Sequence, residues 1–209
     1  MDAATQTYYR LHAAELVPRY LGAVEGISAC FQDAFDGFRR ILDAGCGTGR
    51  DVCTLLLQGH DAFGADACAD MVACAREACR AQGVDPAGRL FEDALPALRH
   101  FSDNEFDGVL CSAVLMHIPD AHLNDAVSGL RRVLRPGGRL LLSIPAACPD
   151  VNPVSRRDAD GRYFADLTAD RLKRLLERIG FRLLWEKTSA DALDRPGRSW
   201  STLLFEREP

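Results

Sequence analysis

The chain has 209 residues, of which 47% are hydrophobic and 26% are charged, and its formal net charge is −5. This length supports one substantial hydrophobic core, and the composition is ordinary for a globular protein. The negative net charge argues against a nucleic-acid partner, because its field repels a phosphate backbone. No apolar run is long enough to cross a bilayer, and the first residues lack a signal-peptide pattern. We therefore expect a cytoplasmic protein without a membrane partner.

Eight cysteines are spread over residues 30–148, with no Cys-x-x-Cys pair and no histidine at zinc-finger spacing. Most of them stand in apolar runs, where a free thiol packs as a small hydrophobe. We therefore predict free thiols and no metal site, rather than a disulfide framework.

Residues 5–38 have apolar side chains at helical spacing and predict a helical segment broken at Pro18 and Gly22. Short apolar runs then alternate with amphipathic stretches. The predicted strands are 39–45, 60–66, 88–94, 105–112, 139–145, 181–188 and 199–208. The predicted helices are 50–58, 69–83, 120–138 with a Pro-Gly-Gly stop, and 168–180 opened by Thr168.

Strands that alternate with helices indicate an α/β protein with a doubly wound, largely parallel sheet covered on both faces. The last two strands are joined by a loop alone, which cannot make a helical crossover, so we expect them to pair antiparallel at one edge. The prediction is a seven-stranded sheet, mostly parallel with an antiparallel edge strand. Ligands bind such sheets at the carboxyl ends of the strands, here just after residues 44, 66, 93 and 111.

The segment ILDAGCGTGRD (41–51) leads from a predicted strand through Gly45, Gly47 and Gly49 directly into a helix. Glycines there allow a tight turn and close approach of a ligand, and the helix start offers free N–H groups. Asp66 stands 21 residues after Gly45, at the end of the second predicted strand. A carboxylate at that position can accept both hydroxyls of a ribose.

The glycine spacing is GxGxG and follows Asp43, whereas dinucleotide sites usually have GxGxxG. A carboxylate beside the loop disfavours a pyrophosphate but suits a ligand with an ammonium and a sulfonium group. DAGCGTG (43–49) resembles the first motif of the class I S-adenosylmethionine-dependent methyltransferases, Asp/Glu-x-Gly-x-Gly-x-Gly. The resemblance implies a Rossmann-like fold, S-adenosyl-L-methionine as cofactor and S-adenosyl-L-homocysteine as product.

Further motifs resemble this family in order and spacing over residues 39–145. In DACADM (66–71), the resemblance implies that Asp66 binds the ribose and that Met71 packs on the adenine. In FEDA (91–94), it implies that Asp93 receives the adenine amino group. FDGVLCSAVLMHIP (106–119) and LRPGGRLLLSIP (134–145) resemble the fourth strand with its loop and the fifth strand. The cofactor-binding residues implied are Asp43, Gly45, Cys46, Gly47, Gly49, Asp66, Ala67, Met71, Asp93, Ala94, Cys111, Ser112 and Tyr9.

The resemblance also implies one methyltransferase domain over residues 1–209. Its parts are an N-terminal helical lid (1–38), a cofactor-binding core (39–145), and a substrate loop with the C-terminal helix and two strands (146–209). Tyr8 or Tyr9 would contact the cofactor from the lid, although core packing explains these aromatic residues equally well. Loop 146–168 is long for a compact domain, which favours a substrate element. Its candidate contacts are Arg156, Arg157, Tyr163 and Phe164.

Methyl transfer from a sulfonium is an in-line displacement that depends mainly on holding the nucleophile close and aligned. A general base is needed only where the acceptor loses a proton, as a hydroxyl does. His117 follows the fourth predicted strand and is our candidate for this catalytic role. The alternative is that His117 packs against the donor or caps the next turn.

No Asn/Asp-Pro-Pro-Tyr/Phe tetrapeptide follows the fourth predicted strand, and no Pro-Cys pair occurs. The first is expected of amino-methylating nucleic-acid enzymes of this fold and the second of cytosine-C5 enzymes, so we predict methylation of an oxygen or nitrogen of a small-molecule acceptor. CSAVLMHIP (111–119) also resembles tellurite-resistance methyltransferases, which leaves a soft acceptor such as tellurite as an alternative. A non-catalytic methyltransferase-like binding protein is another. The sequence does not predict the oligomeric state.

Overall fold

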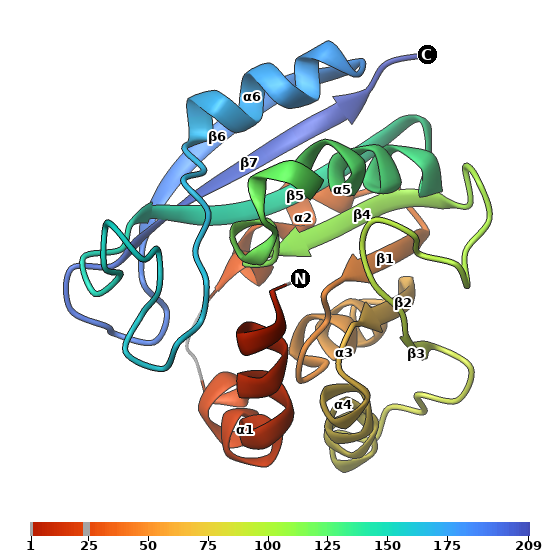
Figure 1. The fold of residues 1–209 in the computed structure, drawn as a ribbon. Coiled ribbons are helices and arrows are strands. Elements are labelled where there is room, and N and C mark those ends of the chain that lie inside the picture. Colours follow the sequence, from red (N-terminus) through yellow and green to blue (C-terminus); the bar gives the residue numbers. More distant parts are fainter. Residues whose placement is uncertain (1, 23–25) are drawn as a thin grey trace.

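The computed structural model describes residues 2–22 and 26–209, and its seven strands form one sheet in the order β3-β2-β1-β4-β5-β7-β6 (Figure 1). β1 to β5 pair in parallel, whereas β7 is antiparallel to both β5 and β6. This confirms the predicted mostly parallel sheet, with the antiparallel pair at one edge and β6 outermost. The strands are β1 Arg40–Ala44, β2 Asp61–Asp66, β3 Leu90–Glu92, β4 Phe106–Ser112, β5 Leu134–Ala147, β6 Phe181–Ala190 and β7 Ser199–Arg207.

Helices cover both faces of the sheet, as predicted (Figure 1). Side chains of α2, α3 and α4 pack on one face, and those of α5 and α6 pack on the other. No helix within the described ranges is long and apolar enough to span a membrane. The helices are α1 Ala3–Leu21, α2 Phe31–Phe35, α3 Arg50–Leu57, α4 Ala69–Ala81, α5 Asp120–Val133 and α6 Ala169–Arg178, with short 3-10 turns η1 Ile27–Cys30 and η2 Leu115–His117.

The central strands carry consecutive apolar residues because both of their faces are buried. In β1, Ile41 faces the α3 side and Leu42 faces the α5 side, and neither side chain is exposed. Leu140 and Leu141 divide in the same way along β5. A run that reads as uniformly hydrophobic in sequence is therefore two alternating sets of core contacts.

Two predicted helical segments differ from the structure by more than two residues. Pro18 lies inside α1, which continues to Leu21 although Pro18 has no N–H to donate to the preceding turn, and the Gly22 N–H bonds the Pro18 carbonyl. Residues 23–25 of the predicted segment lie outside the described residues. The helix predicted over 120–138 ends at Val133, because the chain turns directly into β5 through an irregular pairing with β4.

The prediction that all cysteines are free is wrong for one pair. A disulfide joins Cys53 of α3 to Cys79 of α4, while the other six cysteines are free. Both cysteines are fully buried where the two helices pack on the same face of the sheet. Their separation of 26 residues spans β2, so their proximity comes from the fold and from no local spacing.

α1 belongs to neither of these two helical layers. It lies beside α4 (Figure 1) and packs on it through a small cluster that includes Ala13, Leu16 and Met71. This position brings one face of α1 over the carboxyl ends of the parallel strands.

Candidate active site

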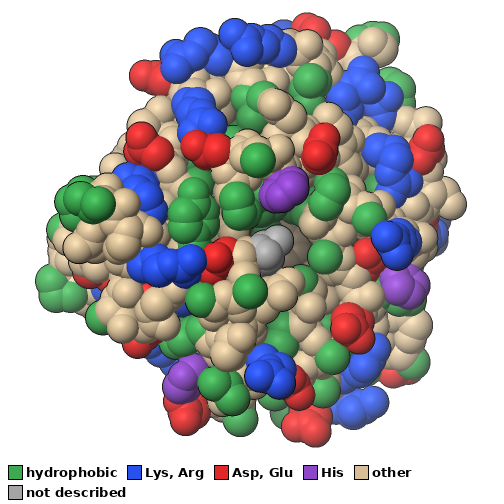
Figure 2. Space-filling view, viewed as in Figure 1, with side chains coloured by type: hydrophobic (Ala, Val, Ile, Leu, Met, Phe, Trp, Pro, Cys, Tyr) green, Lys and Arg blue, Asp and Glu red, His purple; other side chains and the backbone are tan. Residues whose placement is uncertain are grey.

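A cavity of about 260 Å³ lies at the carboxyl ends of β1, β2 and β4. Figure 2 shows this face of the molecule, with acidic and basic side chains interspersed around a hollow. α1, the β6–β7 loop and the segment after β5 complete the cavity wall. Twelve of the fourteen predicted site residues line it: Tyr9, Asp43, Gly45, Cys46, Gly47, Asp66, Ala67, Met71, Asp93, Ala94, Ser112 and His117.

The glycine loop after β1 has three glycines with positive φ, which side chains disfavour. A Cβ on Gly45 would lie 2.2 Å from Val114 Cγ2, and one on Gly49 would lie 2.9 Å from Ala75 Cβ. A Cβ on Gly47 would meet only the Met71 methyl, at 3.6 Å. Packing therefore requires the first and third glycines, and Gly49 itself does not line the cavity. Gly47 leaves open space at the cavity wall, as a closely approaching ligand needs.

Asp66 ends β2 and faces the glycine loop. Its Oδ2 accepts a hydrogen bond from the Gly47 N–H at 2.9 Å, and its Oδ1 accepts one from the Cys68 N–H at 2.9 Å. Burial raises the pKa of Asp66, and these two hydrogen bonds act against that rise. Each carboxylate oxygen can accept a further hydrogen bond from the cavity side.

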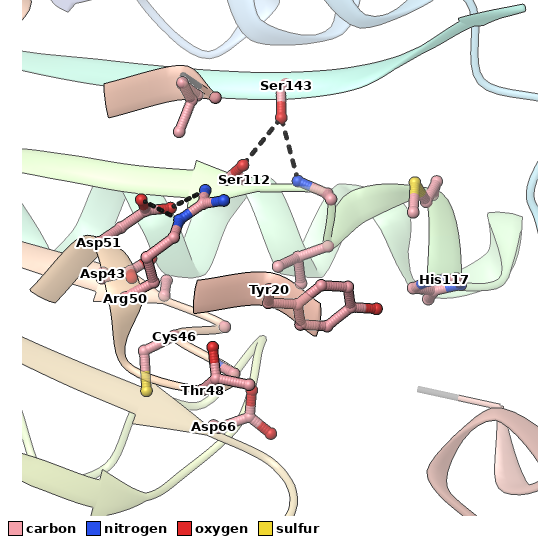
Figure 3. A pocket seen from close by; sticks show the side chains of 18 of the residues that line it. Tyr20, Asp43, Cys46, Thr48, Arg50, Asp51, Asp66, Ser112, His117 and Ser143 are labelled. Atoms are coloured by element: carbon pink, nitrogen blue, oxygen red, sulfur yellow. Dashed lines mark hydrogen bonds and ion pairs between the residues drawn. The ribbon is translucent and has the colours of Figure 1, made fainter. Parts of the chain in front are cut away.

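Asp43, just before the loop, has a side chain that is almost fully buried. Burial raises its pKa well above the usual range, and the nearby Asp51 carboxylate raises it further. Arg50 directs its Nε and Nη2 to Asp51, at 3.0 and 3.1 Å (Figure 3). A cationic ligand in the cavity would stabilise the charged form of Asp43.

Asp93 lines the cavity, but its carboxylate is already engaged. It accepts hydrogen bonds from the Ala94 N–H at 2.8 Å, from the His100 N–H at 2.8 Å and from His100 Nδ1 at 3.0 Å. Burial alone would raise the pKa of Asp93, but the bonds from His100 and Ala94 outweigh it and lower the pKa. His100, which fixes this carboxylate, belongs to no motif that predicts a site residue.

Cys111 does not reach the cavity, unlike the prediction. It is fully buried in the core on the α5 side of the sheet, because successive residues of a strand face opposite sides. Its neighbour Ser112 lines the cavity, with its hydroxyl 3.0 Å from the Ser143 hydroxyl (Figure 3). Ser143 also accepts the Ala113 N–H at 3.2 Å.

His117 lies at the far end of the cavity from Asp43 and Arg50 (Figure 3). Its side chain is almost fully buried, with Nδ1 2.7 Å from the Tyr163 carbonyl oxygen and Nε2 3.2 Å from the Tyr9 hydroxyl. A carbonyl only accepts, so the hydrogen-bond network assigns the proton to Nδ1 and leaves Nε2 to accept the Tyr9 O–H. Burial lowers the pKa of His117 to about 4, so the imidazole is neutral near pH 7.

Tyr9 brings α1 into contact with this histidine. Burial raises the pKa of Tyr9, against the opposing effect of the Arg162 guanidinium, so the phenol keeps its proton. Two further contacts tie α1 to the segment after β5: Thr5 Oγ1 accepts the Tyr163 N–H at 2.9 Å, and Arg157 pairs with Asp2 at 2.9 Å.

The four residues predicted as substrate contacts in loop 146–168 do not line the cavity. Arg157 binds Asp2, Arg156 binds Asp166, and the buried ring of Phe164 packs on His117 at 4.9 Å between centroids. Tyr163 contributes its backbone carbonyl. The cavity residue of this loop is Arg162, which the sequence analysis did not select.

The β6–β7 loop and the start of β7 form a second wall that the sequence did not predict, with Asp191, Arg195, Arg198 and Trp200 on the cavity. Asp191 accepts the Trp200 indole N–H at 2.7 Å and pairs with Arg195 at 2.6 Å. The segment DALDRPGRSW (191–200) reads as an ordinary polar turn. Only the antiparallel return of β7 beside β5 brings it over the site.

Comparisons with known proteins agree with this geometry. A family model described as a methyltransferase domain matches residues 41–138. The chain is 35% identical over 105 residues to the ubiquinone biosynthesis O-methyltransferase of Methylococcus capsulatus, covering 50% of this chain and 43% of that protein. It is 31% identical over 152 residues to an O-methyltransferase of Pyrenophora dematioidea, covering 70% and 55%. The chain thus spans about half the length of these relatives.

Solved structures show the same fold. The 1,6-didemethyltoxoflavin-N1-methyltransferase of Burkholderia thailandensis, with bound 1,6-didemethyltoxoflavin and S-adenosylhomocysteine, has a TM-score of 0.69 at 21% identity, covering 100% of this chain and 92% of that one. The cyclase SpnF has a TM-score of 0.73 at 17% identity, covering 97% and 95%. The matched domain contains the glycine loop, Asp66 and His117. Residues 41–138 thus match the methyltransferase-domain family, and the whole chain has the fold of solved S-adenosylmethionine-dependent methyltransferases.

Proposed function

We propose that the protein transfers the methyl group of S-adenosylmethionine to an oxygen or nitrogen of a small-molecule acceptor. The observation that carries this proposal is a single cavity with the glycine loop and Asp66 at one end and a neutral, buried His117 at the other. Its relatives named as O-methyltransferases favour oxygen as the acceptor atom. When bound, the cofactor would supply a methyl group activated by the positive charge on sulfur.

The cofactor end of the cavity fits such a ligand. The two Asp66 oxygens would each accept one ribose hydroxyl, and the open space beside Gly47 would admit the sugar close to the backbone. The buried Asp43 would pair with the ammonium group. Met71 would pack on the adenine beside the Asp93–Ala94 backbone.

At the acceptor end, His117 would take a proton from an acceptor hydroxyl at Nε2, the atom now facing the Tyr9 hydroxyl. The Nδ1–H bond to the Tyr163 carbonyl would stabilise the imidazolium that forms. The pKa of about 4 keeps His117 unprotonated throughout the neutral range and also makes it a weak base, so it would accept the proton only as the methyl transfer proceeds. We infer that Tyr9 yields this position to the acceptor.

We also propose one domain over residues 1–209 with three roles. Residues 1–38 would cover the bound cofactor, residues 39–145 would hold it, and residues 146–209 would shape the acceptor end. The contacts of α1 with His117 and of the β6–β7 loop with the cavity support this division.

The first experiment is calorimetric titration of the purified protein with S-adenosylhomocysteine, with NAD in a parallel titration. Micromolar binding of the former and no binding of the latter are expected. An acceptor screen with S-adenosylmethionine then compares phenols, amines and tellurite by release of S-adenosylhomocysteine. Binding of NAD instead, or no binding of S-adenosylhomocysteine, would overturn the proposal. Turnover of tellurite alone would replace the small organic acceptor with the soft one.

A further inference from the structure

Three arginines on the acceptor side of the cavity share one arrangement. In each, Nε and Nη2 bind the same aspartate, which leaves the Nη1 group outside that pair; Arg162 Nη2 also lies 3.6 Å from Asp160. The pairs are Arg162 with Asp158, Arg195 with Asp191, and Arg198 with Asp150. All three arginines line the cavity, although they come from two separate loops.

Arg198 is the most informative of the three. Its side chain is 2% exposed, and its Nε lies 2.8 Å from Asp150 Oδ1 while Nη2 binds Oδ2. Its Nη1 is buried and has no hydrogen-bond partner among the described residues. Four other arginine nitrogens in this part of the chain lack partners, but none belongs to a residue that lines the cavity. A buried guanidinium N–H without an acceptor is costly, so a bound acceptor atom would stabilise it.

The neighbouring pair holds a second guanidinium in a fixed orientation. Arg195 binds Asp191 through Nε at 2.9 Å and Nη2 at 2.6 Å, and the Trp200 indole N–H holds the same carboxylate at 2.7 Å. The side chain is therefore ordered before any ligand arrives, which reduces the entropy lost on binding. The paired aspartates offset most of the positive charge of these arginines. What remains to bind a ligand is an N–H group without a partner, held in a fixed direction.

We propose that the methyl acceptor carries an anionic oxygen group, a carboxylate or a phosphate, that binds the free Nη1 of Arg198 with support from Arg195 and Arg162. Guanidinium donors form their strongest hydrogen bonds to such groups. The inference rests on the proposed function, because it assigns the acceptor end of the same cavity. It divides the cavity into a cofactor end built on buried carboxylates and an acceptor end built on arginines.

The test uses the native protein saturated with S-adenosylhomocysteine and three probes with a common phenyl ring: benzoate, phenyl phosphate and benzamide, the neutral isostere of benzoate. Binding is followed by calorimetry and by fluorescence of Trp200, which lines the cavity. We expect at least one anion to bind about tenfold or more tightly than benzamide. The stronger of the two anions distinguishes a carboxylate from a phosphate. Equal binding of benzamide and both anions would overturn the proposal.

Single-residue variants test whether Arg198 is responsible for the preference for an anion. Arg198→Met is expected to abolish the preference for the anion, whereas Arg198→Lys retains part of it. The control Arg182→Met, at an exposed residue of β6 paired with Glu206, retains it fully. Affinity for S-adenosylhomocysteine is measured for every variant, so a failure of the cofactor proposal is distinguished from a failure of this one. An anion preference that persists in a folded Arg198→Met protein contradicts the assignment. If that variant does not fold, the comparison of the three probes on the native protein decides.

Discussion

The two ends of the cavity are built in different ways. The cofactor end consists of backbone conformations at the ends of β1 and β2, with Asp66 held by two N–H groups of neighbouring loops. The acceptor end consists of side chains from α1, the segment after β5 and the β6–β7 loop, paired with one another through Tyr9, His117 and the arginine–aspartate pairs. The first end depends on local sequence, and the second depends on contacts between segments far apart in the chain.

The largest expected effect separates chemistry from cofactor binding. His117→Asn is expected to lower kcat on a hydroxyl acceptor by about 10³-fold, because the proton acceptor is lost. Affinity for S-adenosylhomocysteine should stay within about threefold, since the histidine lies at the other end of the cavity. Steady-state kinetics and calorimetry measure the two quantities. The matched control is His122→Asn, an exposed histidine on α5. Equal losses of kcat and cofactor affinity would show that the two ends are not independent.

The converse variant acts at the cofactor end. Asp66→Asn is expected to weaken S-adenosylhomocysteine binding about 50-fold, through the loss of charge-assisted hydrogen bonds to the ribose. Asp70→Asn, an exposed carboxylate four residues later, serves as the control in the same titration. A 50-fold loss in the control as well would mean that the net charge of the region, and not Asp66, governs affinity.

The pH dependence of stability isolates His117. Its pKa is lowered from 6.5 to about 4 in the folded protein, so the unfolded chain binds the extra proton first as the pH falls. The stabilisation is complete above pH 6.5 and is lost as the pH falls to about 4, with a total on the order of 3 kcal/mol. Urea unfolding at a series of pH values, compared with His117→Asn, measures it. The raised pKa of Asp43 acts in the opposite direction and cancels in the difference between the two proteins. Identical pH slopes would contradict a buried, neutral His117.

Two glycine variants sharpen the description of the cofactor end. Gly45→Ala is expected to lower the free energy of unfolding by about 3 kcal/mol, because the new Cβ meets Val114 at 2.2 Å and φ is +94°. Gly47→Ala meets no such clash and should cost about 1 kcal/mol from its positive φ alone. Denaturation curves measure the stability of the two variants, and cofactor titrations measure their affinity. Gly47→Ala is expected to reduce cofactor affinity more than it reduces the free energy of unfolding. Partial rescue of Gly45→Ala by Val114→Ala would confirm the contact, and its absence would contradict it.

The smallest effect concerns Tyr9. Tyr9→Phe removes the O–H that His117 Nε2 accepts and is expected to change kcat by about fivefold or less. Tyr8→Phe, whose hydroxyl makes no hydrogen bond with a described residue, is the control. A loss as large as that of His117→Asn would make Tyr9 the group that handles the proton.

The sequence predicts the cofactor end well because its determinants are local. Asp43 and Asp66 stand at the ends of buried strands and Gly45 directly follows one, and the carboxyl ends of parallel strands necessarily meet. Even here the sequence does not indicate the alternation of β4: Cys111 and Ser112 are both predicted at the cavity, and only Ser112 faces it. A strand buried on both faces has no polar alternation from which to choose a side.

The acceptor end could not be predicted for a different reason. Arg162 and Arg198 stand in polar loops, whose residues show neither helical nor strand periodicity. Arg198 pairs with Asp150, 48 residues away, and Arg162 pairs with Asp158, one of many aspartates in the chain. The same is true of Cys53 and Cys79, which the packing of α3 on α4 brings together. Arg157, predicted as a substrate contact because of its charge, pairs instead with Asp2 at the start of α1. Its neighbour Arg162 lines the cavity.

The His117 imidazole is a junction of three stretches of chain. Its own residue belongs to η2, one ring nitrogen meets α1 through Tyr9, and the other meets the segment after β5 through the Tyr163 carbonyl. Because Thr5 and Asp2 bind that same segment, α1 and the segment are fastened to each other as well as to the ring. Removal of the first turn of α1 would therefore loosen the Tyr163 carbonyl, which keeps the proton on Nδ1 of His117. That carbonyl lies on the side of the ring opposite Tyr9. The basicity of one side chain is set in part by residues more than a hundred positions earlier in the chain.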